Sequence, residues 1–350
     1  MIHACARSKP GSHVALVIPG LCALDRKDLP EGFPGKRPQA LDRLLSRSRV
    51  RPAAADSFAA TLGGFFGIDA ALPVAPLTWL ADTGEKASGY LLRADPVYLR
   101  ADRSCLRLFD SDTLSIDQDE ADALVAAINA HFSDRGWQLH APHPQRWYLA
   151  LSAIPSITTC PPSELSGQDI NQGLPAGADA GEWHAVLNEV QMLLHSHAVN
   201  SAREQRGAPL VNSLWFWGGG VSPAALQTPV RRVVTDDPLA MGLAGMANVE
   251  RRDVPANAGE LLAPAVDGLT LVAHDTLQLL AAHGEIERWR ATLMQLETDW
   301  FAPLLEALRN GRLSGLELFP VNGRRYATNR SRQRHFWKLI RPYEERCRYK

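Results

Sequence analysis

Two polar side chains, His274 and Asp275, directly follow the largely apolar run at residues 269–273. The run predicts a buried strand, because it is short, bounded by polar residues and rich in aliphatic side chains. Open α/β sheets bind their ligands beyond the carboxyl ends of the strands. The pattern therefore makes His274 and Asp275 the best-placed polar pair for a ligand site.

The other histidines do not match a recognised metal-binding pattern. His195 and His197 lie two residues apart in a predicted helix and so face different directions, whereas helical zinc motifs use histidines four apart. His131, His140 and His143 are not completed by a cysteine or carboxylate at a recognised spacing. We expect no metal ion and no cofactor at these positions.

Basic and aromatic side chains alternate in the segment 324–341, near the C-terminus. Such a mixture suits an acidic protein partner or a nucleic acid, and it is also typical of a solvated edge hairpin protected by its charges. The whole chain has 37 basic and 38 acidic side chains and a formal net charge of -1. With so little net field we expect no nucleic acid and no membrane as partner, and keep a protein partner as the expectation for this segment.

Composition places the chain among ordinary globular proteins, with 350 residues, 45% hydrophobic and 21% charged. Its five cysteines are scattered and form no Cys-x-x-Cys pair: Cys5, Cys22, Cys105, Cys160 and Cys347. A reduced, cytoplasmic setting is the simpler interpretation. Because no run approaches the roughly 20 apolar residues that span a bilayer, we expect neither export nor insertion.

Apolar periodicity predicts the elements of the N-terminal half. Residues 14–18 read as a buried first strand, 40–45 and 57–66 as helices, and 74–80 as a strand that returns to the sheet. From residue 88 the pattern changes to short strands around one helix that Ser115 or Asp117 caps. The elements expected there are strands at 90–100, 105–109, 137–140 and 147–151, a long loop at 157–181 and a helix at 183–203.

Strands and helices alternate in the C-terminal half. The expected strands lie at 213–217, 230–234, 269–273 and 316–319, with helices at 238–246 and 277–308. Alternation of this kind predicts an α/β fold, with a mainly parallel sheet and helices on both faces. We expect a discontinuous core at 13–87 and 205–320, an inserted α+β domain at 88–204, and a basic and aromatic C-terminal segment at 321–350.

One series of residues is more specific. Asn200-Ser-Ala-Arg203, followed by Asn212-Ser-Leu-Trp215-Phe-Trp217-Gly218-Gly-Gly220, resembles a block of the archaeal-type, cofactor-independent phosphoglycerate mutases. That family belongs to the alkaline-phosphatase superfamily, so the resemblance implies an alkaline-phosphatase-like core. Further matches in the same order extend the resemblance over roughly residues 14 to 320: Arg93-Ala-Asp-Pro, Gln145-Arg146 and Ala302-Pro-Leu-Leu-Glu306. The chain also resembles bacterial regulatory proteins of the Rpf type, which would be a degenerate branch.

The resemblance implies chemistry whose first metal ligand is missing. The family moves a phosphoryl group through a serine held between two divalent cations, which requires carboxylates and imidazoles to converge from several strand ends. Its first ligand is an aspartate after the first strand, and Pro19, which has no donor atom, takes that place here. A late Asp-His pair is replaced by Phe319 and Pro320.

The nucleophile position is altered as well. The family's Pro-Gly-Ser-Asp turn is matched by a stretch that puts Ala55 in place of the serine and Asp56 after it, with Ser57 out of register. Asp275 and His283 resemble another Asp and His of the family at a longer spacing. Asp56, Ser57, Asp275 and His283 are therefore the catalytic candidates if a rearranged site is active.

The resemblance also implies a ligand. Arg146 and Arg203 match positions whose guanidinium groups bind phosphate or carboxylate, with Asn200 and Asn212 beside them. The alternative is that the two arginines form salt bridges between the inserted domain and the core. For Trp215 and Trp217 in the same series, packing of a core is the more ordinary role.

These observations lead to one hypothesis and two alternatives. The hypothesis is a catalytically degenerate protein with a binding or regulatory role, whose ligand is a phosphorylated or carboxylated metabolite. The first alternative is an active metal-dependent mutase or phosphatase that uses rearranged residues. The second is a protein-interaction module that works through the basic C-terminal segment.

Overall fold

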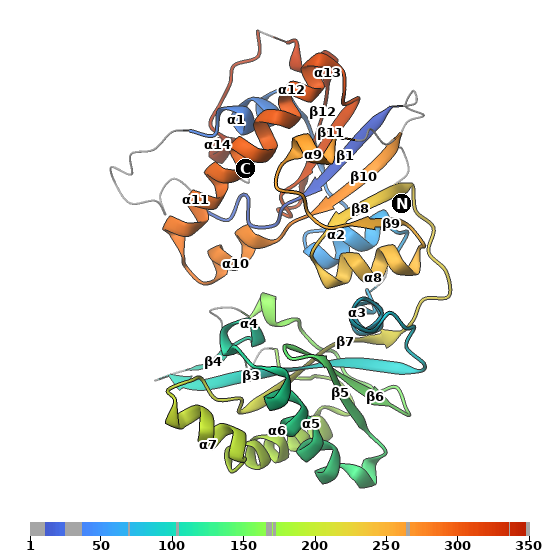
Figure 1. Ribbon diagram of the computed structural model, residues 1–350, viewed down its shortest axis with the longest axis vertical. Helices are drawn as coiled ribbons and strands as arrows, with labels where there is room; N and C mark the ends of the chain where they lie inside the picture. The colour runs from blue at the N-terminus through green and yellow to red at the C-terminus, as the bar shows by residue number, and fades with distance from the viewer. Residues whose placement is uncertain are drawn as a thin grey trace. The chain divides into compact units, whose positions relative to one another are not determined.

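The computed structural model describes residues 11–24, 37–68, 71–102, 105–165, 170, 173–263, 267–335 and 337–347. The chain divides into two compact units (Figure 1). Unit 1 comprises Met1–Ala71 and Ala225–Lys350, and unit 2 comprises Leu72–Ala224. The sequence placed these boundaries at residues 88 and 204, so unit 2 takes in more chain on both sides.

Unit 1 is built on a seven-stranded sheet within the part of the chain that the structure describes. The strands follow the order β2-β12-β11-β1-β10-β8-β9, in which β11, β1, β10, β8 and β9 are parallel and β12 and β2 add antiparallel pairs at one edge. A mainly parallel α/β sheet was predicted and is confirmed. The bounds are β1 (Ser12–Val17), β2 (Arg49–Pro52), β8 (Val230–Thr235), β9 (Glu250–Arg252), β10 (Gly268–Ala273), β11 (Gly315–Phe319) and β12 (Arg324–Asn329).

Helices lie on both faces of this sheet (Figure 1). Val14, Leu16 and Ile18 of the first strand and loop pack with α1, α11 and α12 in one cluster, while the alternate residues Ala15 and Val17 are buried on the opposite side. The two faces are thus both covered, as a parallel sheet requires. The helices are α1 (Gln39–Ser46), α2 (Phe58–Phe65), α8 (Pro238–Met246), α9 (Ala258–Leu261), α10 (Thr276–Ala282), α11 (Ile286–Leu296), α12 (Ala302–Asn310), α13 (Arg330–Gln333) and α14 (Tyr343–Cys347).

The long helical stretch expected at 277–308 is interrupted. Gly284, with φ +70°, follows α10 and lets the chain turn before α11, and a π-helical turn, η4 (Glu297–Phe301), joins α11 to α12. Glu297 in this turn accepts hydrogen bonds from the backbone N–H groups of Ala40 at 2.6 Å and Leu41 at 3.1 Å. It therefore caps α1, whose own N-cap, Pro38, has no side chain for that role.

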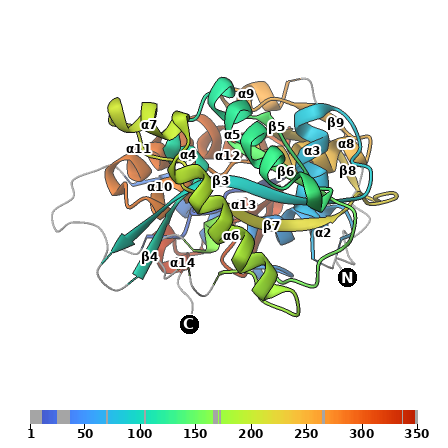
Figure 2. The same ribbon diagram turned by 90° about the horizontal axis from the view of Figure 1, so that it is seen from below.

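Unit 2 contains a five-stranded antiparallel sheet, counted over the described ranges. The order is β4-β3-β6-β5, and β7 pairs with the other edge of β3. Figure 2 shows α5, α6 and α7 on one face of this sheet. The bounds are α3 (Val74–Thr83), β3 (Tyr90–Asp102), β4 (Cys105–Phe109), α4 (Ser111–Leu114), α5 (Gln118–His131), η1 (Ser133–Arg135), β5 (Gln138–His143), β6 (Arg146–Leu151), η2 (Pro162–Glu164), α6 (Ala180–His195), α7 (Ala198–Gln205) and β7 (Ser213–Val221).

Three predictions about elements were wrong. Residues 74–80 form helix α3 rather than a strand. The helix accommodates Pro76 because this residue falls in the first turn, where proline is tolerated. The helix expected at 183–203 is two helices, since the chain breaks before α7 and the His197 side chain caps it. The strand expected at 213–217 is β7, which joins the antiparallel sheet of unit 2 and not the central sheet.

The C-terminal segment is part of unit 1 and not a separate appendage. Strand β12 extends the central sheet, and Tyr343 of α14 is buried in the cluster that contains β1. The expectation of reduced cysteines was also wrong for one pair, because Cys22 and Cys347 form a disulfide across 325 residues of sequence. Cys5 and the side chain of Cys105 lie outside the described residues.

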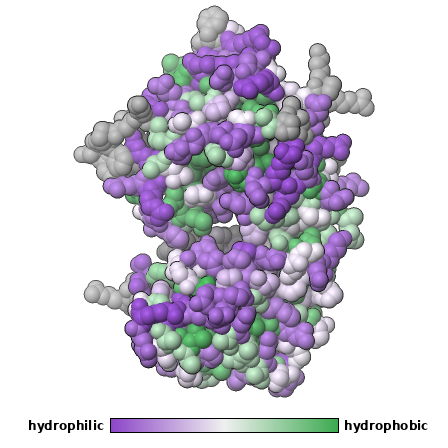
Figure 3. All heavy atoms as spheres, viewed as in Figure 1, coloured by the Kyte–Doolittle hydropathy of each residue, from purple (hydrophilic) through white to green (hydrophobic). Residues whose placement is uncertain are grey.

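Hydrophilic residues predominate on the face shown in Figure 3, with apolar residues in small groups between them. Within the described ranges, no helix has both the length and the apolar composition that crossing a bilayer requires.

Candidate functional site

The carboxyl ends of four neighbouring strands in unit 1 lie side by side. Val17 stands in register with Ala273 on one side and with Phe319 on the other, and Ala273 stands in register with Thr235. The residues that follow these four strands therefore gather at one edge of the sheet. They are the loop 18–22 after β1, Asp236 and Asp237 after β8, His274 and Asp275 after β10, and Pro320 after β11.

The loop after β1 is packed tightly against the beginning of α10. Gly20 has φ +79°, and a Cβ atom there would lie 2.5 Å from the backbone nitrogen of Gln278. Only glycine fits this position, both for its dihedral angle and for the space. The carbonyl oxygen of Gly20 accepts a 3.0 Å hydrogen bond from Nε1 of Trp289. The loop that carries Pro19 is thus fixed by protein contacts at the place where the mutase pattern has its first metal ligand.

Asp237 is the most perturbed acid at this edge. It is the N-cap of α8, where its Oδ1 accepts a 2.7 Å hydrogen bond from the backbone N–H of Ala240. Burial raises the pKa of Asp237 to about 7, and the charges of Asp275 and Asp236 add to the shift, against the hydrogen bond from Ala240. Near neutral pH this carboxyl group therefore exchanges between its acid and its ionised form.

His274 and Asp275 occupy the strand end at which the sequence predicted a ligand site. The backbone N–H of His274 donates to the carbonyl of Val17 at 3.0 Å, which continues the ladder between β10 and β1. The Nδ1 atom of His274 is buried and has no hydrogen-bond partner among the described residues. Asp275 precedes α10 and is near enough to Asp237 to raise the pKa of that carboxyl group.

Sequence reasoning missed Asp237. A signal was present, because the Asp-Asp-Pro sequence at 236–238 directly follows a predicted strand and starts a predicted helix. Aspartate before a proline at the first helical position is a common way to begin a helix. The same placement beyond a strand end that singled out His274 applies equally to Asp237.

The remaining catalytic candidates have ordinary structural positions. Ser57 is the N-cap of α2, and its Oγ accepts a 3.2 Å hydrogen bond from the backbone N–H of Ala60. Asp56, just before it, is exposed. Asp275 and His283 flank opposite ends of α10, which separates them by roughly 12 Å along the helix axis. The described residues include no group of three or more His, Cys, Asp or Glu side chains arranged to hold a metal ion.

Arg203, one of the predicted ligand-binding residues, is completely buried within unit 2. Its Nη1 donates to Oε2 of Glu120 at 2.5 Å, its Nε to the carbonyl of Pro209 at 2.7 Å, and its Nη2 to the carbonyl of Leu114. These contacts tie α7 to the start of α5, which the Asp117 and Glu120 capping box begins. Every nitrogen of the guanidinium group is thus used inside the unit, and its role is structural.

The side-chain amides of Asn200 and Asn212 form hydrogen bonds with backbone groups of the same unit. Asn200 Nδ2 donates to the carbonyls of Leu194 and Val211, at 2.8 and 2.7 Å, and its Oδ1 accepts from the N–H of Val211 at 2.9 Å. Asn212 Oδ1 accepts from the N–H of Leu99 at 2.7 Å, and its Nδ2 donates to the carbonyl of Leu99 at 2.8 Å. Both amides therefore satisfy backbone groups that would otherwise lack a partner.

Arg146 is more accessible than Arg203. Its Nε and Nη2 donate to the carboxylate of Asp82, at 2.9 and 2.6 Å for the shortest contacts, and the arginine side chain is 23% exposed. Its Nη1 donates to no described residue. Burial works to raise the pKa of Asp82, but hydrogen bonds from Arg146 and Tyr148 outweigh it and hold that pKa below its usual value.

A second ion pair, Arg93 with Asp95, lies fully inside unit 2. Arg93 Nη2 donates to Asp95 Oδ1 at 2.7 Å, and Trp217 Nε1 donates to Asp95 Oδ2 at 2.7 Å. The Arg93 guanidinium also lies 5.2 Å from the ring centres of Tyr148 and Trp217. Trp217 therefore packs and orients a buried charge pair, in agreement with the packing role considered for it.

A surface hollow of unit 2 lies elsewhere. It has a volume of about 470 Å³ and is lined by Tyr98, Arg100, Phe109, Thr113, Glu204 and residues 207–210. The Arg100 guanidinium lies 4.9 Å from the ring centre of Phe109. None of the predicted site residues lines this hollow, so it does not coincide with the candidate site at the sheet edge.

Comparison with known proteins gives a distant relationship. The chain is 27% identical over 140 residues to the 2,3-bisphosphoglycerate-independent phosphoglycerate mutase of Methanosarcina mazei, covering 39% of this chain and 35% of the relative. The match to the mutase of Methanosarcina acetivorans is 26% over 183 residues, covering 49% and 46%. The chain is related to these mutases. It spans less than half the length of either relative, and no protein-family model matches it.

The solved structure of another phosphoglycerate mutase also aligns with this mutase-like chain. The cofactor-independent phosphoglycerate mutase of Thermoplasma acidophilum aligns over 91% of this chain and 90% of its own, with a TM-score of 0.42 and 15% sequence identity.

Proposed function

We propose that this phosphoglycerate-mutase-like chain is catalytically degenerate and serves as a cytoplasmic binding or regulatory protein. Such a role is the one that its resemblance to the Rpf type implies. Its ligand in this proposal is a phosphorylated or carboxylated metabolite. The distant relationship to the mutases supports the choice of ligand class, and the chemistry of the sheet edge supports the loss of catalysis.

The observation that carries the proposal is the loop after β1. Pro19 has no side-chain donor, Gly20 packs directly against the backbone of α10, and Trp289 holds the Gly20 carbonyl. A phosphoryl transfer that depends on a metal bound at this loop would need a donor that these residues do not supply. Since a metal clamp contributes several kcal/mol and each ~1.4 kcal/mol is tenfold in rate, its loss removes most of the rate enhancement.

The alternative function is an active metal-dependent mutase or phosphatase with a rearranged site. The observation that favours it is the proximity of Asp237 and Asp275, two carboxyl groups at the edge where open α/β sheets bind ligands. Hard divalent cations prefer such oxygen donors. In this alternative Ser57 or a neighbouring group would replace the nucleophile.

An assay of 3-phosphoglycerate separates the two functions. The full chain is incubated with 3-phosphoglycerate and Mn²⁺ or Mg²⁺, and products are followed by phosphorus NMR. We expect neither 2-phosphoglycerate nor free phosphate above the background without protein. Turnover that a chelator abolishes and that Ser57→Ala or Asp275→Asn reduces at least tenfold would establish the alternative.

Among the four predicted ligand-binding residues, Arg146 has a hydrogen-bond donor, Nη1, that no described residue uses. Its Nη1 and its partial exposure allow it to contact a phosphate or carboxylate while Asp82 orients the guanidinium plane. Calorimetric titration with 3-phosphoglycerate tests this role. We expect Arg146→Ala to weaken binding about tenfold or more, as the loss of a charge-assisted hydrogen bond implies.

A matched control is Arg135→Ala in the same unit. Arg135 is also a partly exposed arginine paired with a carboxylate, that of Glu182 at 2.7 Å. We expect this variant to bind 3-phosphoglycerate as the unmodified protein does. Equal weakening in both variants would show that any binding depends on general charge and not on Arg146.

The C-terminal segment supports a protein partner as an addition to this proposal. Trp337 and Leu339 are 68% and 74% exposed, and Lys338 and Arg341 lie beside them. Exposed aromatic and basic side chains together suit a partner with an acidic rim. A polyglutamate peptide is a suitable probe, and Trp337→Ser should reduce its binding; no binding in either protein would remove this partner from the proposal.

A further inference from the structure

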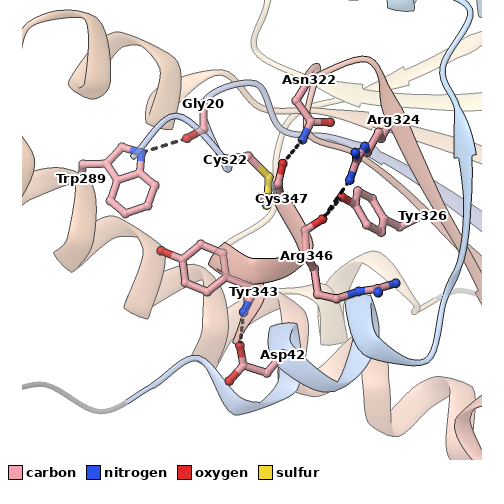
Figure 4. Close-up of a disulfide and its surroundings, with 10 residues drawn as sticks. All are labelled: Gly20, Cys22, Asp42, Trp289, Asn322, Arg324, Tyr326, Tyr343, Arg346 and Cys347. Atoms are coloured by element: carbon pink, nitrogen blue, oxygen red, sulfur yellow. Dashed lines mark hydrogen bonds between the residues drawn. A yellow bond between two sulfur atoms is a disulfide. The ribbon is translucent and has the colours of Figure 1, made fainter. Parts of the chain in front are cut away.

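The last described helix, α14, is covalently attached to the loop after the first strand. Cys347 at the end of α14 forms a disulfide with Cys22, and their Cα atoms are 5.5 Å apart (Figure 4). That separation is within the usual range for a disulfide. Both cysteines are only partly buried, so the bond lies close to the surface of unit 1.

The two ends of α14 are held differently. At the beginning, Tyr343 is buried in the core, and its backbone N–H donates to Oδ1 of Asp42 at 2.6 Å. At the end, beside the disulfide, the carbonyl of Arg346 accepts a 2.7 Å hydrogen bond from the Tyr326 hydroxyl, and the carbonyl of Cys347 accepts a 3.4 Å contact from Asn322. The disulfide is therefore the strongest attachment of the far end of α14.

The same bond restrains the loop 18–24. Gly20 in this loop is already held by Trp289 and by its packing against α10, whereas Cys22 and Ala23 lie nearer the surface. The disulfide thus connects the loop at the carboxyl end of β1 to the C-terminus. Two segments that are distant in sequence respond together to the state of one bond.

We infer that Cys22 and Cys347 form a thiol–disulfide switch that controls the mobility of the far end of α14 and of the loop after β1. The reductant is a dithiol, whose thiolate attacks one sulfur and forms a mixed disulfide. Its second thiol then displaces the protein sulfur. The dithiol leaves as its own disulfide, and its two electrons and two protons remain on Cys22 and Cys347 as thiols.

Release is local and does not unfold unit 1. The buried Tyr343 ring and the hydrogen bond from the Tyr343 backbone N–H to Asp42 do not depend on the disulfide, and they keep the start of α14 in place. The released part is the end of α14 with the neighbouring loop residues 22–24. This inference concerns the movement of the chain and does not require that the proposed metabolite binds.

The test uses the full chain with dithiothreitol as the dithiol. Peptide mapping under non-reducing conditions should recover a linked pair of peptides that contain Cys22 and Cys347. On reduction we expect amide hydrogen exchange to become roughly tenfold faster or more in 22–24 and 344–347, with little change in β3 of unit 2. Cys22→Ser and Cys347→Ser should each show the fast exchange without reductant, and dithiothreitol should then have no further effect.

Cys160→Ser is the matched control, because Cys160 is not part of this disulfide, and it should respond to reductant as the unmodified chain does. Three results would overturn the inference. One is the absence of the linked peptides under oxidising conditions. The second is unchanged exchange in both segments after reduction. The third is fast exchange throughout unit 1, which would show that the bond supports the whole fold and is not a local switch.

Discussion

The Nε1 atom of Trp289 donates a 3.0 Å hydrogen bond to the carbonyl oxygen of Gly20 and so joins α11 to the loop after β1 (Figure 4). Trp289 is fully buried in the cluster that fills one face of the central sheet. Its indole packs in the core while its nitrogen satisfies a carbonyl group at the carboxyl end of the sheet. The core of unit 1 thereby fixes the loop that carries Pro19.

Replacing Trp289 by phenylalanine should destabilise unit 1. The change removes the hydrogen bond to the partly buried Gly20 carbonyl, which costs about 1 kcal/mol beyond the loss of ring volume. Trp300→Phe is the control, since Trp300 lies in the same cluster and its indole makes no hydrogen bond to a described residue. Urea denaturation should give a clearly lower midpoint for Trp289→Phe; equal midpoints would show that the hydrogen bond adds nothing.

The tight packing at Gly20 predicts a severe effect of one methyl group. Gly20→Ala places Cβ 2.5 Å from the backbone of Gln278 at a φ of +79°. Gly284→Ala is a matched control in the same unit, with φ +70° and no atom within 4 Å of the added Cβ. The control should lose about 1 kcal/mol from backbone strain alone, and Gly20→Ala should lose several times more.

Thermal unfolding checks this comparison. A similar loss in the two alanine variants would mean that the loop after β1 can move away from α10. In that case the space beside Pro19 would be larger than the structure indicates, and the argument for a fixed loop would fail.

The central strands were predictable because their signal is local. The runs at 14–18, 230–234, 269–273 and 316–319 are short and rich in aliphatic residues, most of which are buried, and each lies within a residue or two of the strand that the structure shows. The helix at residues 74–80 was not predictable, since a short run that is mostly apolar shows neither the helical nor the strand periodicity clearly. Strand β7 was assigned to the wrong sheet, because its pairing with β3 is a long-range contact that periodicity does not encode.

The placement of His274 and Asp275 at a strand end was predictable, whereas the contacts and burial around them were not. The rule about strand ends placed His274 and Asp275 correctly at the edge of the sheet. Burial decides the pKa values and hydrogen-bond partners of the site residues, and burial is a property of the tertiary structure. Burial raises the pKa of Asp237. It also places Arg203, which the sequence suggested as an anion-binding residue, inside unit 2, where its donors bind other residues of that unit. The Cys22 and Cys347 disulfide likewise joins positions with no local pattern.

The buried pair of Arg203 and Glu120 should be essential to the stability of unit 2. Arg203→Met leaves Glu120 buried with the half-exposed Arg206 as its one remaining charged partner among the described residues, and such a change typically costs about 3–5 kcal/mol. Arg135→Met breaks the exposed pair with Glu182 and should cost about 0–1 kcal/mol. Denaturation midpoints followed by tryptophan fluorescence measure both; a small loss for Arg203→Met would contradict the structural role assigned to it.

Asp237 should make the stability of unit 1 depend on pH between about 4 and 7. In the unfolded chain this carboxyl ionises at the ordinary value of 3.8, whereas in the folded chain burial raises its pKa to about 7. Between these values the folded state binds more protons, so the stabilising contribution is complete below the lower value and is lost as the pH rises through about 7. At one pKa unit per ~1.4 kcal/mol, the upper bound of the loss is about 4 kcal/mol.

Asp237→Asn tests this dependence, because asparagine keeps the cap on the N–H of Ala240 and cannot ionise. We expect the variant to match the unmodified chain near pH 3.5 and to become the more stable of the two as the pH rises, so that the difference in unfolding free energy grows from about pH 4 to 7 and levels off above that. Asp117→Asn makes the same change at an exposed N-cap of unit 2 and is the matched control for the substitution itself. Parallel stability curves for Asp237→Asn and the unmodified chain from about pH 4 to 7 would show that Asp237 is ionised at little cost, and would place the source of any pH dependence at another group on the sheet edge.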